Sequence, residues 1–139
     1  MNRKHTCIVL MIFCLLFIYA CQQKHKEETS TPSYKKIDGI EAKRIMNETS
    51  DYILLDVRTE PEFNSSHIEG AILIPDYEIQ RVLTEIPNKD ALVLIYCRSG
   101  RRSAEVAYKM LSMGYTNIYD FGGIIDWKYE IINPQLLEK

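Results

Sequence analysis

The sequence has little of what metal sites and nucleic-acid interfaces require. It contains only three histidines, and two of them, His5 and His25, fall outside the part that reads as a folded domain. Basic residues are not in excess, because 17 Lys and Arg stand against 19 Asp and Glu, for a net charge of -2. No glycine-rich nucleotide loop follows an early strand. We therefore expect no metal ion, no other cofactor and no nucleic-acid partner.

The sequence also lacks an apolar run that could cross a bilayer. Residues 7–19 are apolar, but they fall short of the roughly 20 residues that a membrane-spanning helix needs. Basic residues precede the run and a polar stretch follows it, which is typical of a secretory signal. The run ends at Tyr19-Ala20-Cys21, which resembles a bacterial lipobox and implies cleavage before Cys21 and lipidation of Cys21. An uncleaved anchor and a plain signal peptide are the alternatives.

These features predict three parts. They are a removed signal peptide (1–20), a lipidated cysteine with a flexible tether (21–33), and a single folded domain (34–139). We expect a lipid-anchored protein of the bacterial cell envelope whose domain lies outside the cytoplasm. Nothing in the sequence indicates more than a monomer.

Cysteine is scarce in the predicted domain. Of the four cysteines, two lie in the signal segment and Cys21 is the expected lipid site, so Cys97 is left alone. Small secreted domains usually use cysteines in disulfide pairs. An unpaired thiol is therefore either a small buried hydrophobe or a reactive group, and the residues around Cys97 decide between the two.

Short apolar runs alternate with segments of helical spacing. The runs that predict strands are 52–55, 71–74, 91–96 and 118–121. The segments that predict helices are 40–46 capped by Asp38, 60–63, 79–86, 104–111 ending before Gly114, and 124–131. Strands that are apolar on both faces and alternate with helices indicate an α/β fold, with a parallel sheet between layers of helices.

Cys97 lies where this architecture places its chemistry. It directly follows the most apolar strand and precedes a helix, and ligands of parallel sheets bind at the carboxyl ends of the strands. The free N–H groups and the dipole at the start of the helix attract anions. Arg98, Arg101 and Arg102 add positive charge, and Gly100 lets the backbone curl around one point. A cysteine in such a loop is expected to be largely thiolate, which is the nucleophile.

The loop resembles the active-site loop of rhodanese-type sulfurtransferases, Cys-x-x-x-x-Arg/Thr, because an arginine follows Cys97 by five positions. The related dual-specificity phosphatases use a loop one residue longer. Residues 56–59, 62–63 and 67–71 resemble the first signature of the family, and residues 114–115, 122–124 and Trp127 resemble its second. The resemblance implies a three-layer α/β/α fold with a mostly parallel five-stranded sheet. It implies Cys97 as the catalytic residue and a substrate-binding loop made of Arg98, Ser99, Gly100, Arg101, Arg102 and Ser103.

The resemblance implies that Cys97 takes sulfane sulfur from a small anionic donor and passes it, as a persulfide, to a thiol or a protein acceptor. Arg102 and the loop N–H groups are expected to stabilise the persulfide, and Arg98 and Arg101 to steer the donor. Arg98, in place of glycine, favours thiosulfate over mercaptopyruvate. A persulfide carrier with little small-molecule turnover would use the same loop. A phosphatase or arsenate reductase is disfavoured, because the loop is too short for a tetrahedral oxyanion.

Four further residues outside the loop are candidates for supporting or structural roles. Asp56 and Arg58 are supporting residues near the loop. Asp56 either orients the loop arginines or forms a structural ion pair, and the second role is the more common one. We interpret His67 as a hydrogen-bonded turn residue. Trp127 is expected to be a core aromatic close enough to the last strand to border a pocket.

Overall fold

The computed structural model describes residues 33–134. The expected signal peptide, the Cys21 lipid site and most of the tether lie outside these residues. Five strands form one sheet in the order β1-β5-β4-β2-β3, and every neighbouring pair is parallel. The predicted five-stranded parallel sheet is thus confirmed. The strands are β1 (Lys35–Lys36), β2 (Ile53–Asp56), β3 (Ile72–Leu73), β4 (Val93–Cys97) and β5 (Ile118–Gly123).

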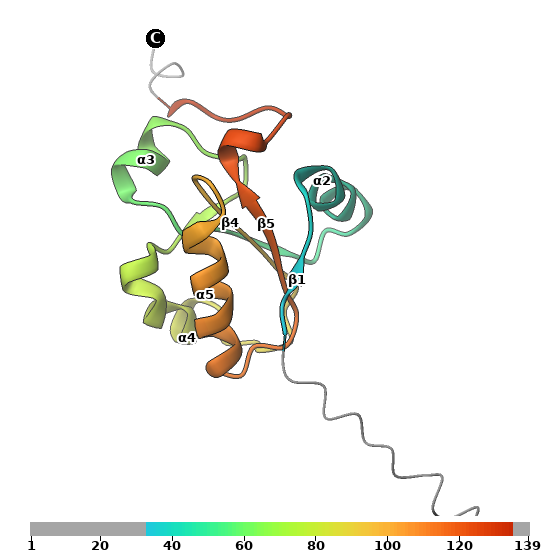
Figure 1. The fold of residues 1–139 in the computed structure, drawn as a ribbon, viewed down its shortest axis with the longest axis vertical. Helices are drawn as coiled ribbons and strands as arrows, with labels where there is room; N and C mark the ends of the chain where they lie inside the picture. Colours follow the sequence, from blue (N-terminus) through green and yellow to red (C-terminus); the bar gives the residue numbers. More distant parts are fainter. Residues whose placement is uncertain (1–32, 135–139) are drawn as a thin grey trace, which may run out of the picture. The chain divides into compact units, whose positions relative to one another are not determined.

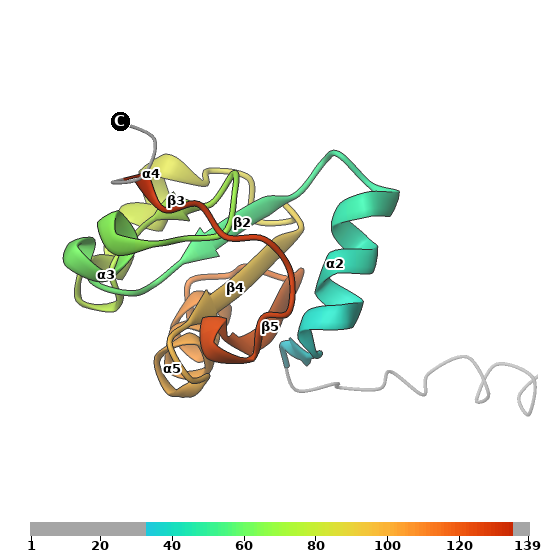
Figure 2. The ribbon, with the colours of Figure 1, turned by 90° about the horizontal axis from the view of Figure 1, so that it is seen from above.

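Helices cover both faces of this sheet, as the three-layer prediction requires. Helix α2 lies on one face and helices α4 and α5 lie on the other (Figure 1), and the view from above separates the layers (Figure 2). Within residues 33–134 no helix is both long and apolar enough to span a membrane. The helical elements are α2 (Gly39–Glu48), α3 (Glu60–Ser65), the 3-10 helix η1 (Asp76–Arg81), α4 (Val82–Glu85), α5 (Arg101–Ser112) and the 3-10 helix η2 (Ile124–Asp126).

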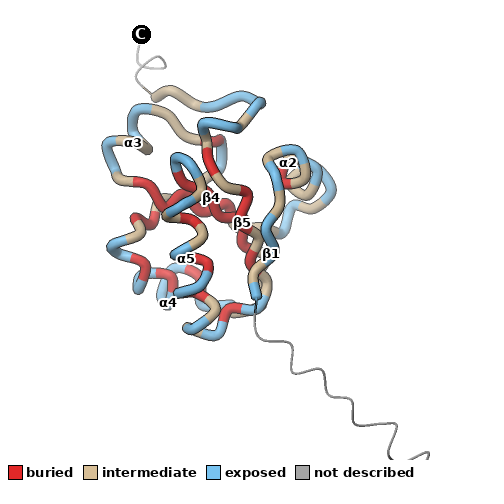
Figure 3. The backbone as a smooth tube through the Cα atoms, in the orientation of Figure 1, coloured by how far each residue is buried: buried red, intermediate tan, exposed pale blue. Residues whose placement is uncertain are grey.

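The core lies on both faces of β4. All five residues of this strand are buried, and the buried segments of Figure 3 gather at the sheet. Val93, Ile95 and Cys97 pack into the cluster that includes α5 residues, whereas Leu94 and Tyr96 pack into the cluster that includes Ala42 of α2. This two-sided burial explains why the strand is apolar at every position.

The cap predicted at Asp38 and the helix end predicted before Gly114 are confirmed, whereas residues 79–86 form the end of the 3-10 helix η1 and the short α4 in place of one continuous helix. The Asp38 side chain caps α2 by accepting a hydrogen bond from the Glu41 N–H (2.8 Å). Pro61 lies in the first turn of α3, where its missing N–H costs little. Helix α5 ends at Ser112, and Gly114 follows with a φ of +92°.

The prediction of a helix over residues 124–131 is wrong. Only the short η2 forms, and Trp127 directly after it is extended, with φ -70° and ψ 121°. His67 and Ile132 form an antiparallel bridge with hydrogen bonds of 2.9 and 2.7 Å. This backbone pairing to the loop after α3 competes with helix formation, and helical spacing of apolar residues gives no sign of it.

Two smaller expectations also differ. Strand β1 is made of two exposed lysines, so its place at the sheet edge comes from backbone pairing with β5 and not from an apolar pattern. In α5 the buried residues are Ser103, Val106, Ala107 and Met110. Tyr108 lies within the segment 104–111, whose apolar spacing predicts the helix, but it is 63% exposed and packs edge-on against Tyr34, with ring centroids 5.0 Å apart.

Candidate active site

Cys97 is the last residue of β4, and the chain turns from it directly into α5 at the carboxyl end of the sheet (Figure 1). Its side chain is buried and forms no disulfide. The turn is made by Gly100, whose φ of +95° is in the left-handed region. The Gly100 N–H donates to Cys97 Sγ at 3.1 Å. The loop therefore presents a backbone donor to the sulfur, as the sequence predicted.

Ser103, in the first turn of α5, is a second polar contact of the sulfur. The Cys97 thiol donates to Ser103 Oγ at 3.6 Å. Ser103 Oγ in turn donates to Gly100 O (3.1 Å) or to Gly122 O (3.4 Å). The hydroxyl is buried and has several acceptors around a single hydrogen.

The carboxyl end of β5 packs directly against the backbone of the Cys97 loop. Gly123 lies so close to the loop that a Cβ there would come within 2.4 Å of Arg98 O. Ile125 N–H donates to the same carbonyl oxygen at 3.3 Å. Gly122 precedes this contact with a φ of +86°. The two consecutive glycines thus allow the loop and the strand to touch backbone to backbone.

The three loop arginines have different surroundings. Arg102 donates two hydrogen bonds to Glu62, each 2.8 Å long. Arg101 is exposed and pairs with Glu105 at 2.7 Å within α5. Arg98 is exposed, and no acidic side chain pairs with it in the described part of the chain. The guanidinium of Arg102 is therefore directed to a carboxylate, and its predicted contact with the persulfide stays a prediction.

Glu62 joins α3 to the Cys97 loop. Its carboxylate accepts from Arg102 and also from the Thr59 N–H (3.0 Å) and hydroxyl (2.9 Å), which completes the cap of α3. These hydrogen bonds, chiefly those from Arg102, lower the pKa of Glu62 to about 2. Its carboxylate in turn raises the pKa of Arg102. Both groups are thus charged across the usual pH range.

Asp56 and Arg58 bind each other and not the loop arginines. Arg58 Nη2 lies 2.6 Å from Asp56 Oδ2, and both side chains are almost fully buried. Arg58 also donates to Ser66 O at 2.7 Å. Burial opposes the charge of Arg58, but the hydrogen bonds to Asp56 keep its pKa above the ordinary value. The structure places Asp56 in the structural role that we considered the more common one.

The side chains of His67 and Tyr96 both contact the segment from α3 to Ile68. The His67 ring stacks on Phe63 with centroids 3.9 Å apart, and its Nδ1 lies 2.9 Å from Phe63 O. The Tyr96 hydroxyl accepts from the Ile68 N–H at 3.2 Å. Burial and the nearby charge of Asp56 raise the pKa of Tyr96. These contacts order the chain after α3, and none of them involves Cys97.

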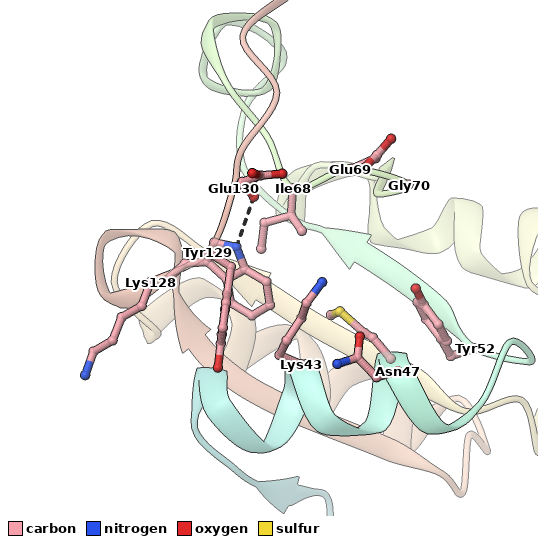
Figure 4. Close-up of a pocket in the computed structure, with 11 residues that line it drawn as sticks. Lys43, Asn47, Tyr52, Ile68, Glu69, Gly70, Lys128, Tyr129 and Glu130 are labelled. Atoms are coloured by element: carbon pink, nitrogen blue, oxygen red, sulfur yellow. Dashed lines mark hydrogen bonds between the residues drawn. The ribbon is translucent and has the colours of Figure 1, made fainter.

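A cavity of about 820 Å³ lies on the α2 side of the sheet, apart from the Cys97 loop. Figure 4 shows it between Lys43 and Asn47 of α2 and the segment that carries Tyr129 and Glu130. Trp127 also lines this cavity, which contains no residue of the Cys97 loop, so its expected place beside the active-site pocket stays a prediction. Among residues 33–134, no group of three or more His, Cys, Asp or Glu side chains is placed to bind a metal.

Sequence reasoning missed two carboxylates that support the loop. Glu62 follows Thr59 by three positions, which is the spacing of a capping box, so its place in α3 could have been predicted. Its pairing with Arg102, forty positions away, could not. Asp120 is 1% exposed in β5. A single acid within the apolar run Ile118–Gly123 was the available signal for it.

Comparisons with known proteins agree with this geometry. A family profile described as a rhodanese-like domain matches residues 40–130. The thiosulfate sulfurtransferase PspE of Escherichia coli is 37% identical over 73 residues, which cover 52% of this chain and 70% of that protein. A sulfurtransferase of Allochromatium vinosum is 37% identical over 93 residues, covering 66% and 86%. A solved structure, described as a rhodanese with anions from E. coli, is 36% identical with a TM-score of 0.53, covering 59% and 98%.

Proposed function

The chain belongs to the rhodanese-like family, and from this premise we propose that it is a sulfurtransferase that carries sulfane sulfur as a persulfide on Cys97. The observation that carries the proposal is the position of the sulfur. It lies at the carboxyl end of the central strand, with the Gly100 N–H aimed at it from 3.1 Å. Relatives that act on thiosulfate support the same chemistry.

The first half of the reaction uses the thiolate. Cys97 S⁻ attacks the outer sulfur of thiosulfate, a sulfur–sulfur bond forms, and the bond to the inner sulfur breaks with release of sulfite. The negative charge moves to the outer sulfur of the persulfide. Backbone N–H groups of the loop are fixed before the reaction, so they can stabilise this charge without reorganisation. Arg98 is exposed beside the loop and attracts the dianionic donor.

The second half regenerates the thiolate. A thiolate acceptor, free or on a protein, attacks the outer sulfur of the persulfide, and Cys97 S⁻ leaves as the new persulfide forms on the acceptor. Neither half needs a general base once both thiols are ionised. Sulfur transfer in this form is redox-balanced, because the sulfane sulfur keeps its oxidation state and only changes its partner.

The test is the mass of the intact protein after incubation with thiosulfate. We expect the wild type to gain the mass of one sulfur atom, to lose it on addition of a reductant, and to carry it on Cys97. The reductant step is necessary, because a sulfinic acid has nearly the same added mass and does not revert. The C97S variant is the control and should gain nothing. No gain in the wild type would reject thiosulfate as donor.

Turnover separates an enzyme from a carrier. A sulfurtransferase releases sulfite continuously when thiosulfate and cyanide are both present, whereas a carrier with little turnover gives one equivalent of sulfite and then stops. We propose the enzyme, because Arg98 lies exposed and without an acidic partner in the described residues, and so remains available to a small dianion. A lipid anchor on Cys21 would place this activity at a membrane surface of the cell envelope.

A further inference from the structure

Asp120 is a buried carboxylate that the mechanism above does not use. It lies in β5, and its Oδ1 accepts a hydrogen bond from the Gly122 N–H at 3.0 Å. Its Oδ2 is buried and has no hydrogen-bond partner among the described residues. A buried polar oxygen without a hydrogen-bond partner is costly. Stability of the sheet alone therefore gives no reason for an aspartate at this position.

The hydrogen bond to Asp120 fixes the turn on which the Cys97 loop rests. Gly122 has a φ of +86°, which L side chains rarely adopt. The next residue, Gly123, is close enough to the loop for a Cβ to meet Arg98 O at 2.4 Å. Because strand and loop touch backbone to backbone here, whatever holds Gly122 in place also holds the loop.

The Gly122 carbonyl contacts the hydroxyl nearest to the sulfur. Ser103 Oγ lies 3.4 Å from Gly122 O, 3.1 Å from Gly100 O and 3.6 Å from Cys97 Sγ. When Cys97 is a thiol, its S–H donates to Oγ and the hydroxyl donates to a carbonyl. When the sulfur is a thiolate, the hydroxyl can turn its hydrogen to the sulfur while its oxygen stays in place.

We propose that Asp120 is a positioning residue for Cys97. It fixes the Gly122 turn, the turn holds the Ser103 hydroxyl, and the hydroxyl stabilises the Cys97 thiolate. The relevance of this chain of contacts to catalysis rests on the proposed function, in which the thiolate is the nucleophile of the first step and the leaving group of the second. On this view, Asp120 is present for its Oδ1, which accepts from the Gly122 N–H, and its Oδ2 is left without a partner as a consequence.

The test compares S103A, D120V and D120N in the full-length chain, using the rate at which iodoacetamide alkylates Cys97 at neutral pH. We expect S103A and D120V each to slow alkylation about threefold to tenfold, as for the loss of one hydrogen bond to the sulfur. D120N keeps an acceptor for the Gly122 N–H and should recover most of this loss. The S103A/D120V double variant should be no slower than S103A, because Asp120 acts through Ser103. I118V, a conservative core change in the same strand, is the control.

Melting temperatures separate this role from a purely structural one. Valine removes the buried oxygen that lacks a partner but also the acceptor of the Gly122 N–H, two opposed effects on stability, so D120V should melt close to the I118V control although its Cys97 reacts more slowly. D120A also removes the acceptor and replaces D120V if the valine variant does not fold. Alkylation of D120V at the wild-type rate, or losses that multiply in the double variant, would overturn the proposal. Alkylation needs no sulfur donor, so these outcomes are independent of whether the wild type forms a persulfide.

Discussion

At the scale of single residues, the charges around Cys97 divide into paired and unpaired arginines. Arg102 is held by Glu62 through two short hydrogen bonds, so its charge is balanced locally. Arg101 makes an exposed pair with Glu105, a kind of contact that contributes little. Arg98 has no acidic partner within residues 33–134. It is therefore the loop cation most available to an incoming dianion.

The R98A variant should bind thiosulfate more weakly. We expect its KM for thiosulfate to rise about threefold to tenfold with a smaller change in kcat, because Arg98 acts on the approach of the donor and not on the sulfur. The KM of the wild type should also rise more with ionic strength than that of the variant. R81A is the control. It removes an exposed arginine of η1 that pairs with Glu78 of η1 and Glu85 of α4. An unchanged KM with the same salt dependence would argue against this role.

Glu62 should make stability depend on pH in the acid range. Its pKa falls from 4.5 to about 2 in the folded protein, so its contribution is complete above the unfolded value and is lost as the pH falls from about 4.5 to 2. We expect the wild type to exceed E62Q in unfolding free energy by about 1–3 kcal/mol at pH 7. The gap should close by pH 2, as measured by urea denaturation. A gap that is constant over this range would contradict the ion pair.

Local signals made Cys97 and its loop predictable, whereas the carboxylates that support the loop were not. The loop is contiguous, and its chemistry follows from a cysteine, a glycine and arginines within one turn of chain. Glu62 and Asp120 reach the loop from other elements, and their partners are fixed only when α3 and β5 pack beside β4. Burial of the Asp56–Arg58 pair is likewise a tertiary property, and composition at a strand end does not reveal it.

At the scale of elements, the contact between β5 and the loop is the tightest junction of the site. The G123A variant places a Cβ within 2.4 Å of Arg98 O and 2.7 Å of Ser99 Cα, both of them backbone atoms. The loop must shift to relieve this overlap. We expect a loss of about 1–3 kcal/mol of stability, together with a large fall in the rate of persulfide formation measured by intact mass.

The matched control for this change is G114A, at the end of α5. Gly114 also has a positive φ, of +92°, but a Cβ there would meet nothing within 4 Å. Alanine should cost about 1 kcal/mol through backbone strain alone and leave sulfur transfer unaffected. If both variants lose activity in proportion to their stability, the junction has no special role in the site.

Helices and strands were predictable from the sequence where their own apolar pattern or capping residue determines the structure. Strand β4 is apolar throughout because both of its faces are buried, and α2 begins where Asp38 can cap it. Residues 124–131 have helical spacing, yet only the short η2 forms there, because Ile132 pairs with His67 from a distant loop. Strand β1 shows the reverse case, since two lysines without any apolar pattern become a strand by pairing with β5.

At the scale of the whole domain, an all-parallel sheet separates the first described residue from the Cys97 loop. The described chain begins at Ser33 and runs into the amino end of β1. Cys97 ends β4, so it lies at the carboxyl ends of the parallel strands. Figure 1 shows the loop between β4 and α5 at the end of the domain away from the start of β1. Among the described residues, the first one and the Cys97 loop therefore lie at opposite ends of the strands.

This geometry predicts that anchoring and catalysis are independent. If Cys21 carries lipid, C21S should move the protein from the membrane fraction to the soluble envelope fraction, as followed by fractionation. Its kcat and KM for thiosulfate should equal those of the wild type in detergent, because the described chain begins at the amino ends of the strands and Cys97 lies at their carboxyl ends. C97S should show the converse, staying with the membrane while losing sulfur transfer. A C21S protein that keeps its membrane location would mean that the apolar run of residues 7–19, and not a lipid, provides the anchor.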